Sequence, residues 1–227
     1  VVPSVKVGDK EYKIELVEVD NQSDKTAAVT AAQSLVSQGV SVVLGSYGSG
    51  VSIAAGSTFA DAKIPAIGCS CTNPQVTLGN DYYYRVCFLD PFQGTVMASY
   101  ANTEGCKKAA VIMQNGDDYS TGLATYFKNA FAKQDGCEIV YEGTYNTNET
   151  DFNAILTATK AANPDVIFVP SSITTAGLFI KQARELGIEA KIMAGDTWEN
   201  ATIIENAGKD NCEGVALSTF FDENDAT

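Results

Sequence analysis

The chain has 227 residues, of which 45% are hydrophobic and 19% charged, so it can build a hydrophobic core and is not expected to be disordered. Its formal net charge is −13, which argues against binding to nucleic acids or anionic membrane surfaces, because both require a basic surface. No uninterrupted apolar run approaches the roughly 18 residues that a membrane-spanning helix needs.

Short apolar runs alternate along the chain with longer amphipathic segments, a pattern typical of β-α-β units around a mainly parallel sheet. Most of these runs are apolar throughout their centres, as expected for strands covered on both faces. Strands are expected at 13–19, 41–44, 66–68, 83–86, 108–113, 138–141, 166–169, 191–194 and 214–218. Helices are expected at 25–38, 51–60, 92–101, 122–133, 152–162, 175–186 and 200–206.

One segment, 89–94, interrupts this alternation with the sequence Leu-Asp-Pro-Phe-Gln-Gly. We interpret it as a crossover between two doubly wound, Rossmann-like α/β lobes. The first, incomplete lobe then comprises residues 1–90 and the second 91–218, and residues 219–227 begin a return crossover. The alternative, an ordinary strand–helix loop within a single sheet, stays open at this point.

Both ends of the pattern look unfinished. The strand at 13–19 begins the alternation without a preceding helix, and residues 222–227 stop just after a strand. A doubly wound lobe whose outer strands lack partners would expose apolar faces. We therefore expect the chain to be a portion of a longer protein.

Polar loops follow several of the expected strands, at the edge where open α/β sheets bind ligands. The loop Gly48-Ser49-Gly50 offers backbone N–H groups at a helix start and the Ser49 hydroxyl, which can bind an anion. A small carboxylate is a better candidate than a polyphosphate, because the sequence has no Walker or GxGxxG pattern here. In Ser70-Cys71-Thr72-Asn73-Pro74, proline keeps the chain extended, and Thr72 can donate to a carboxylate and accept from an ammonium. A capping turn without a ligand is the alternative for both loops.

Two further loops add a carboxylate and a phenol. In Gly195-Asp196-Thr197-Trp198, Asp196 can neutralise a ligand amine, a contact that contributes roughly 1.5–3 kcal/mol. Tyr119, after the strand at 108–113, can cover a bound amino acid and donate its hydroxyl to the ligand carboxylate. Donors for an anion together with an acceptor for a cation fit a zwitterion, so we expect an amino acid. The alternatives are a helix cap for Asp196 and simple packing for Tyr119 and Trp198.

Nothing in the sequence indicates catalysis, a metal or a cofactor. The chain has no histidine, which excludes Ser-His-Asp and Cys-His machinery and histidine-based metal sites within it. A lysine base or paired carboxylates stay open, but no lysine lies at the carboxyl end of an expected strand. The six cysteines lack CxxC spacing. Cys106 and Cys137 each precede an expected strand, so they can form a disulfide or remain free buried thiols.

Many short runs occur in a recognisable order: residues 13–17 and 20–24, Leu44-Gly45-Ser46, Ile64-Pro65-Ala66-Ile67, Cys71-Thr72-Asn73-Pro74, Arg85, Asp90, Gln93-Gly94, Tyr119-Ser120-Thr121-Gly122, Asp151-Phe152, Pro164-Asp165 and Ala207-Gly208. As an ordered set these runs resemble the type I periplasmic binding proteins, and among them the branched-chain amino acid (Leu/Ile/Val) receptors of ABC transporters. The resemblance covers essentially the whole chain, whereas no single run is specific.

The resemblance implies a ligand held between two α/β lobes that close on a hinge. It implies a serine that binds the ligand carboxylate, a segment that binds both α-groups, a covering tyrosine and an acidic partner of the ammonium. The carboxylate-binding serine corresponds to Ser49, and the segment that binds both α-groups corresponds to Ser70, Cys71 and Thr72. The covering tyrosine corresponds to Tyr119, and the acidic partner of the ammonium corresponds to Asp196. Further possible ligand contacts are Gly48, Ser172 and Trp198.

The chain departs from the family pattern in its pocket and in its extent. Cys71 stands where alanine is common, which is harmless if the ligand contacts only its backbone. Ser172 or Ile173 stands where a ligand-facing aromatic is common, so the side-chain pocket is expected to differ. The family's first strand and helix, and a long C-terminal part, have no counterpart in these residues.

We therefore expect an extracytoplasmic solute receptor without enzymatic activity. It would bind a free amino acid, branched-chain or similarly apolar or small, and present it to an ABC-transporter permease. We expect a monomer in the periplasm or a lipoprotein at the cell surface, with no nucleic acid partner. The alternative is an amino-acid or amide sensing domain of a signalling or regulatory protein on the same fold. A Rossmann-like enzyme is disfavoured because dinucleotide and phosphate fingerprints are absent.

Overall fold

The structure is a computed structural model that describes residues 3–221. The chain is an α/β protein with parallel sheets, as expected, and it divides into two compact units. Unit 1 comprises residues 1–69 and 76–86, and unit 2 comprises residues 70–75 and 87–227. Residues 70–75, which we had expected in the first lobe, thus group with unit 2. Of the expected return crossover at 219–227, residues 222–227 lie outside the described residues.

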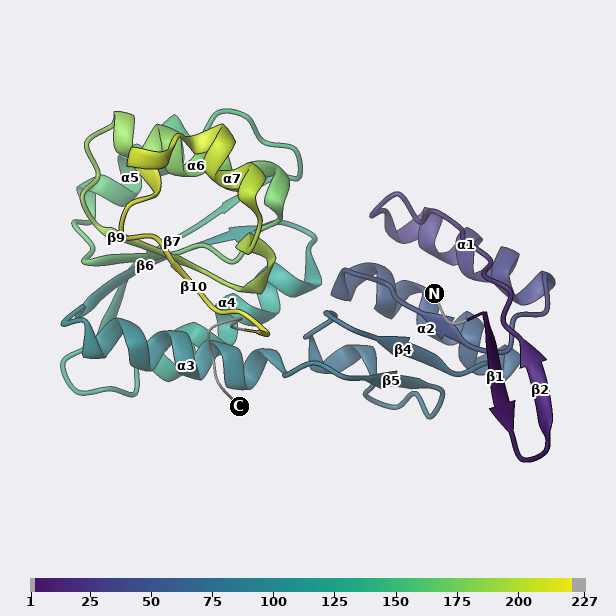
Figure 1. Cartoon of the computed structure of the whole chain (residues 1–227). Helices are drawn as coiled ribbons and strands as arrows, with labels where there is room; N and C mark the ends of the chain where they lie inside the picture. Colours follow the sequence, from purple (N-terminus) through teal and green to yellow (C-terminus); the bar gives the residue numbers. More distant parts are fainter. Residues whose placement is uncertain (1–2, 222–227) are drawn as a thin grey trace. The chain divides into compact units, whose positions relative to one another are not determined.

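Unit 1 consists of a small parallel sheet, two helices and a separate β-hairpin (Figure 1). The sheet has the strand order β3-β4-β5, and helices α1 and α2 pack against each other. The elements are β1 Ser4–Val7, β2 Lys10–Lys13, α1 Lys25–Ser37, β3 Val43–Leu44, α2 Ser49–Ala62, β4 Ala66–Gly68 and β5 Tyr83–Arg85.

The strand expected at 13–19 was wrong. Residues 14–20 form no strand, because no described strand pairs with them, and Leu16 remains 67% exposed. The hairpin β1–β2 forms instead, with Ser4 paired to Lys13 across a turn at Gly8-Asp9. Its signal was present in the sequence, since a Gly-Asp pair between two alternating runs is typical of a two-residue hairpin turn.

Unit 2 contains one sheet of five parallel strands in the order β10-β9-β8-β6-β7. Helices α3 and α4 cover one face of this sheet, and α5, α6 and α7 cover the other (Figure 1). The elements are α3 Asp90–Thr103, β6 Lys108–Gln114, α4 Asp118–Phe131, β7 Glu138–Tyr145, α5 Asn153–Ala161, β8 Val166–Phe168, α6 Ile173–Glu185, β9 Lys191–Ala194, α7 Ala201–Ala207 and β10 Ala216–Leu217, with 3₁₀ turns at Asp196–Trp198 and Lys209–Cys212. A further 3₁₀ turn, Pro74–Val76, includes residues assigned to both units.

The strands of unit 2 are apolar throughout because both faces of the sheet are covered. Along β6, Ala110 and Ile112 pack in the cluster with α5, α6 and α7, whereas Ala109 and Val111 pack in the cluster with α3 and α4. All four side chains are fully buried. Within the described residues, no helix is both long and apolar enough to cross a membrane.

The segment 89–94, expected as a crossover, is in fact the start of a helix. Leu89 is the N-cap of α3, Asp90 lies in its first turn and Pro91 follows at the next position. Both residue types suit a helix start, since an acidic side chain complements the positive end of the helix dipole and proline needs no N–H partner there. The division between the units falls earlier, between Val86 and Cys87.

Helices α3 and α4 pack closely at Gly94. A methyl group on Gly94 would lie 2.7 Å from the Phe127 backbone nitrogen and 2.9 Å from the Tyr126 carbonyl carbon. These are backbone atoms, so they cannot rotate away as a side chain could. The glycine therefore sets the spacing of the two helices that carry much of the polar edge described below.

We expect Gly94→Ala to lower the free energy of unfolding of unit 2 by about 1–3 kcal/mol, because the helices must separate and loosen the core. Trp198, the only tryptophan and buried in unit 2, reports this transition by fluorescence in a urea titration. Ser99→Ala, on the exposed side of the same helix, is the matched control and should leave the midpoint unchanged. Equal midpoints for Gly94→Ala and the wild type would contradict this packing argument.

Candidate functional site

Polar side chains of unit 2 gather at the carboxyl edge of its sheet, around the point where the strand order reverses. The chain runs from β6 outward to β7 and then returns past β6 to β8, β9 and β10. In such sheets the loops on either side of the reversal diverge and leave a crevice beyond the strand ends. Tyr119 follows β6, Ser171 follows β8 and Asp196 follows β9, so three loops contribute polar groups to this edge.

Asp196 is a buried carboxylate, with 6% of its surface exposed. Its Oδ1 accepts a hydrogen bond of 3.0 Å from the Tyr119 hydroxyl, and its backbone N–H donates to Gln93 Oε1 at 3.0 Å. Burial raises the pKa of the Asp196 carboxyl, while the contacts with the Tyr119 and Gln93 side chains act in the opposite direction. Asp196 does not cap α7, because the Asn200 side chain does so by accepting from the Thr202 N–H.

Tyr119 is held at the start of α4. The Asp117 carboxylate caps this helix and accepts from the Tyr119 N–H at 2.9 Å. The Thr197 hydroxyl contacts the Tyr119 hydroxyl at 3.4 Å and donates to the Ser171 carbonyl at 2.7 Å. Burial, together with the negative charge of Asp196, raises the pKa of the Tyr119 phenol well above its usual value. Tyr119 is therefore a neutral donor beside the carboxylate.

Gly195 makes this arrangement possible. A methyl group built on it would lie 2.1 Å from the Tyr119 hydroxyl oxygen and 2.9 Å from Gln93 Oε1. Any side chain at this position would push the phenol away from Asp196. The close approach of the loop after β9 to α3 and α4 thus requires glycine.

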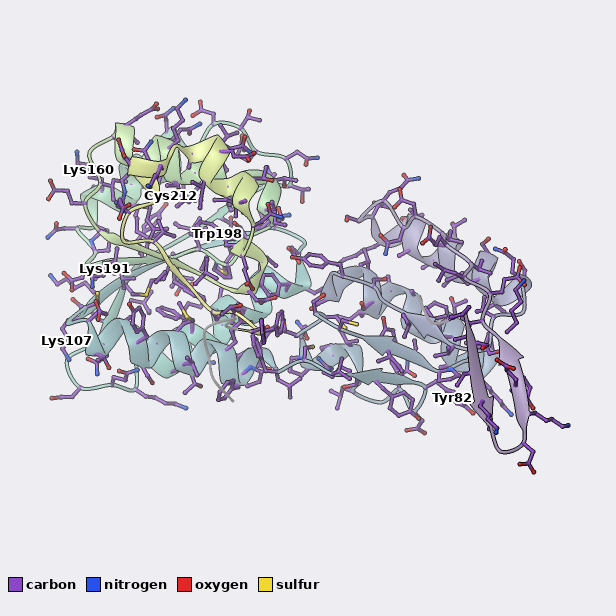
Figure 2. All side chains as sticks on the ribbon, viewed as in Figure 1. Tyr82, Lys107, Lys160, Lys191, Trp198 and Cys212 are labelled. Atoms are coloured by element: carbon purple, nitrogen blue, oxygen red, sulfur yellow. The ribbon has the colours of Figure 1, made fainter. Side chains whose placement is uncertain are left out.

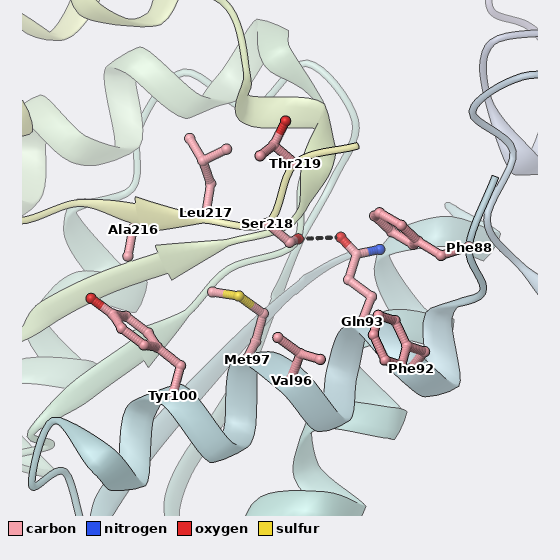
Figure 3. Close-up of a pocket in the computed structure, with 10 residues that line it drawn as sticks. All are labelled: Phe88, Phe92, Gln93, Val96, Met97, Tyr100, Ala216, Leu217, Ser218 and Thr219. Carbon is pink, nitrogen blue, oxygen red and sulfur yellow. Dashed lines mark hydrogen bonds between the residues drawn. The ribbon is translucent and has the colours of Figure 1, made fainter. Parts of the chain in front are cut away.

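Gln93 is the polar residue of this edge that sequence reasoning missed. Its Oε1 accepts from the Asp196 N–H at 3.0 Å. The same oxygen accepts from the Ser218 hydroxyl at 2.5 Å, a hydrogen bond that Figure 3 shows. Its amide nitrogen contacts Asp90 Oδ1 at 3.4 Å. Asp90 and Gln93 lie three positions apart on the inner face of α3, a spacing that would have revealed them had 89–94 been recognised as a helix start.

The segment 70–75 joins this polar cluster within unit 2. The Thr72 carbonyl accepts from the Asp90 N–H at 3.0 Å, and the Asn73 side chain donates to the Asp118 carbonyl at 2.7 Å. Thr72 and Cys71 are fully buried, and Ser70 is half-buried. The Thr72 hydroxyl is buried and has no hydrogen-bond partner among the described residues.

The two predicted residues of unit 1 lie at the start of α2. Gly48 is the N-cap, and Ser49 is buried in the first helical turn rather than capping it. The loop before them is anchored by Tyr83, whose hydroxyl donates to the Gly45 carbonyl at 2.8 Å and accepts from the Ser46 N–H at 3.2 Å. The ligand roles of Gly48 and Ser49 stay predictions.

Ser172 and Trp198 lie at the same edge of unit 2 but have protein partners. Ser172 precedes α6, and its hydroxyl donates to Gln114 Oε1 at 3.1 Å. Trp198 lies inside unit 2 (Figure 2), in the cluster with α5, α6 and α7, and its indole N–H donates to the Ser171 hydroxyl at 3.1 Å. Both side chains support the edge, and a direct ligand contact by either one stays a prediction.

A hollow of about 360 Å³ lies between α3 and β10 (Figure 3). No charged side chain lines it, so it does not suit the two ends of a zwitterion. Its lining residues are Phe88, Phe92, Gln93, Val96, Met97, Tyr100, Ala216, Leu217, Ser218 and Thr219. Among residues 3–221 there is also no group of three or more histidine, cysteine or acidic side chains that could hold a metal ion.

Comparison with known proteins adds a family and several relatives. A family model described as "Periplasmic binding protein" matches residues 5–227. An amino acid binding protein of Pseudomonas aeruginosa is 34% identical over 211 residues, which are 92% of this chain and 56% of that protein. A Leu/Ile/Val-binding protein homologue of Brucella abortus is 31% identical over 209 residues, which are 92% of this chain and 56% of that protein.

Two solved structures are similar in sequence and in fold. A leucine-binding protein of Thermotoga maritima has 33% identity and a TM-score of 0.90, covering 95% of this chain and 61% of that one. A branched-chain amino acid binding protein of Streptococcus pneumoniae in complex with isoleucine has 32% identity and a TM-score of 0.83, covering 90% of this chain and 58% of that one. The chain thus spans little more than half the length of these relatives.

We expect Gln93→Leu to raise the pKa of the Asp196 carboxyl further, because leucine removes the amide contact that opposes the effect of burial. Carboxyl-carbon NMR of the ligand-free protein, titrated with pH, measures this change directly. Gln33→Leu, on the exposed side of α1, is the control and should leave that titration unaltered. If Asp196 titrates identically in Gln93→Leu and the wild type, Gln93 does not tune the carboxylate.

Proposed function

The chain belongs to the periplasmic binding protein family, and from that premise we propose that it forms an amino-acid-binding part of an extracytoplasmic solute receptor. The family and the similar proteins described above are binding proteins rather than enzymes. In this proposal the polar edge of unit 2 recognises the α-ammonium and contributes to recognition of the α-carboxylate.

The observation that carries the proposal is the buried Asp196 carboxylate. The side chain that donates to it, Tyr119, is neutral, and no lysine or arginine of the described residues forms an ion pair with it. Buried carboxylates are otherwise paired with a cation or become protonated, because burial disfavours an isolated charge. The α-ammonium of an amino acid supplies the missing charge and several N–H donors.

The Thr72 hydroxyl supports the carboxylate half of the proposal. It is buried without a described protein partner, so it can donate to a ligand at no loss of a protein hydrogen bond. Thr72 is linked to Asp196 inside unit 2, since its carbonyl accepts from Asp90 N–H and Gln93 contacts both Asp90 and Asp196. In this proposal the ligand carboxylate lies beside Thr72 and the ligand ammonium beside Asp196.

The remaining predicted contacts enter the proposal with smaller roles. Ser70 contributes a hydroxyl to ligand binding, and Cys71 contributes its backbone groups. Ser49 of unit 1 contributes a further hydroxyl that donates to the ligand carboxylate. Gly48, Ser172 and Trp198 are kept as possible contacts.

We propose a branched-chain or similarly apolar or small amino acid as the ligand. This choice is supported by relatives that carry the names amino acid binding and Leu/Ile/Val-binding, and by the isoleucine complex of the Streptococcus pneumoniae protein. The receptor would act as a monomer in the periplasm or as a cell-surface lipoprotein, and an ABC-transporter permease would receive its ligand. No observation favours the alternative of a sensing domain.

We expect Asp196→Asn to weaken amino acid binding at least tenfold, because a charge-assisted contact of about 1.5–3 kcal/mol is lost. The wild type should also lose affinity as the pH falls through the raised pKa of Asp196, since the protonated carboxyl no longer pairs with the ammonium. Isothermal titration with leucine, isoleucine and valine over a pH series measures both effects.

Glu189→Gln is the control for this experiment, because it removes one negative charge at the opposite end of the strands, where Glu189 is exposed. It should bind as the wild type does at every pH. Equal affinity of Asp196→Asn and the wild type would contradict the assignment of the ammonium to Asp196.

We expect Thr72→Val to weaken amino acid binding about tenfold while leaving the protein at least as stable as the wild type. The valine removes a hydroxyl that makes no described protein contact, so folding loses no hydrogen bond and the ligand loses one. Titration with the same amino acids and a urea unfolding curve separate the two effects. Undiminished affinity, or a clear loss of stability, would argue that this hydroxyl serves the fold instead.

A further inference from the structure

Cys106 and Cys137 lie beside each other at the amino edge of unit 2's sheet. Strands β6 and β7 are neighbours and parallel, with Lys108 paired to Glu138, and the Glu138 N–H donates to the Lys107 carbonyl at 2.8 Å. The strand spacing of about 4.8 Å and one residue of offset, about 3.3 Å, place the two cysteine Cα atoms about 6 Å apart. Disulfides need a Cα separation of about 4.4–6.8 Å.

Both thiols also point to the same side of the sheet. Cys106 is a member of the apolar cluster between the sheet and helices α3 and α4, and Cys137 packs against that cluster. The Cys137 sulfur lies 3.9 Å from the Cys106 carbonyl oxygen. Cys212, by contrast, packs against the cluster on the other face of the sheet, so it cannot substitute for either thiol.

The two thiols differ in their access to solvent. Cys106 is buried, and burial raises the pKa of its thiol, an effect that the nearby Lys191 ammonium partly offsets. Cys137 is only partly buried, and its sulfur lies 3.6 Å from the Asn102 side-chain oxygen. Lys107 and Lys191 stand at the same edge (Figure 2). The carboxylates of Asp165 and Glu104 also raise the pKa of the Cys106 thiol, so the net shift at Cys106 is upward.

We propose that Cys106 and Cys137 are a site of reversible covalent modification and form a disulfide by exchange with a small disulfide such as oxidised glutathione. The Cys137 thiolate attacks one glutathione sulfur, forming a mixed disulfide and releasing one glutathione thiolate. The Cys106 thiolate then attacks the Cys137 sulfur, closing the protein disulfide and releasing the second glutathione. The protein loses two electrons and two protons, and the glutathione disulfide gains them as two thiols.

The bridge would stabilise unit 2 without involving the candidate ligand site. It joins residues 31 positions apart and so closes the segment that contains β6 and α4, which restricts the unfolded chain. We expect it to raise the melting temperature by at least about 4 °C. The cysteines precede the strands, whereas Tyr119 and Asp196 follow them, so ligand affinity should not change.

The test begins with the fully reduced folded chain, incubated with excess oxidised glutathione, quenched in acid and digested with trypsin. Mass spectrometry should find peptide 86–107 linked to peptide 134–160, and a reducing agent should separate the two peptides. Because peptide 86–107 also holds Cys87, the link must persist in Cys87→Ser and disappear in Cys106→Ser.

Cys137→Ser provides a second variant at the less buried position, in case Cys106→Ser folds poorly. It should lose both the linked peptide and the rise in melting temperature. Absence of the linked peptide, its appearance only in urea, or its persistence in Cys106→Ser or Cys137→Ser would overturn the proposal. Because this assay contains no amino acid, its outcome is independent of the proposed receptor function.

Discussion

The hydrogen bond between the Tyr119 hydroxyl and the Asp196 carboxylate exists because Gly195 leaves no side chain between α4 and the loop after β9. The same gap lets Gln93 reach the Asp196 backbone. Three elements, α3, α4 and the loop after β9, thus meet at one buried carboxylate. Neutral donors surround it, and no described lysine or arginine forms an ion pair with it, so in the proposed function the ligand ammonium would supply the missing positive charge.

The parallel sheet separates two kinds of chemistry. All five strands of unit 2 point the same way, so every loop that follows a strand lies at one edge and every loop that precedes one lies at the other. Tyr119 and Asp196 therefore gather at the carboxyl edge, and Cys106 and Cys137 gather at the amino edge. A change at one edge can leave the other unaltered because a continuous apolar core lies between them.

Predictions from the sequence were most accurate for strands that are covered on both faces of the sheet. The strands expected at 66–68 and 191–194 have those bounds in the structure, because a short apolar run covered on both faces has few other ways to fold. The predictions failed at 13–19, where an apolar run has no partner strand, and at 89–94, where the start of a helix was interpreted as a crossover between lobes. At 13–19 the deciding factor was the lack of a partner strand among the described residues, whereas at 89–94 the local residues Asp90 and Pro91 already suit a helix start.

The sequence by itself determined the alternation of strands and helices and the polar residues that follow each strand, because these depend on local composition and periodicity. It thereby identified Thr72, Tyr119 and Asp196 as candidates. Only the tertiary structure decided that Gln93 connects Asp196 to Ser218, since these contacts join residues 103 and 125 positions apart. The requirement for glycine at 195 also arises from contacts between distant segments, and the residues next to Gly195 in the sequence do not reveal such contacts.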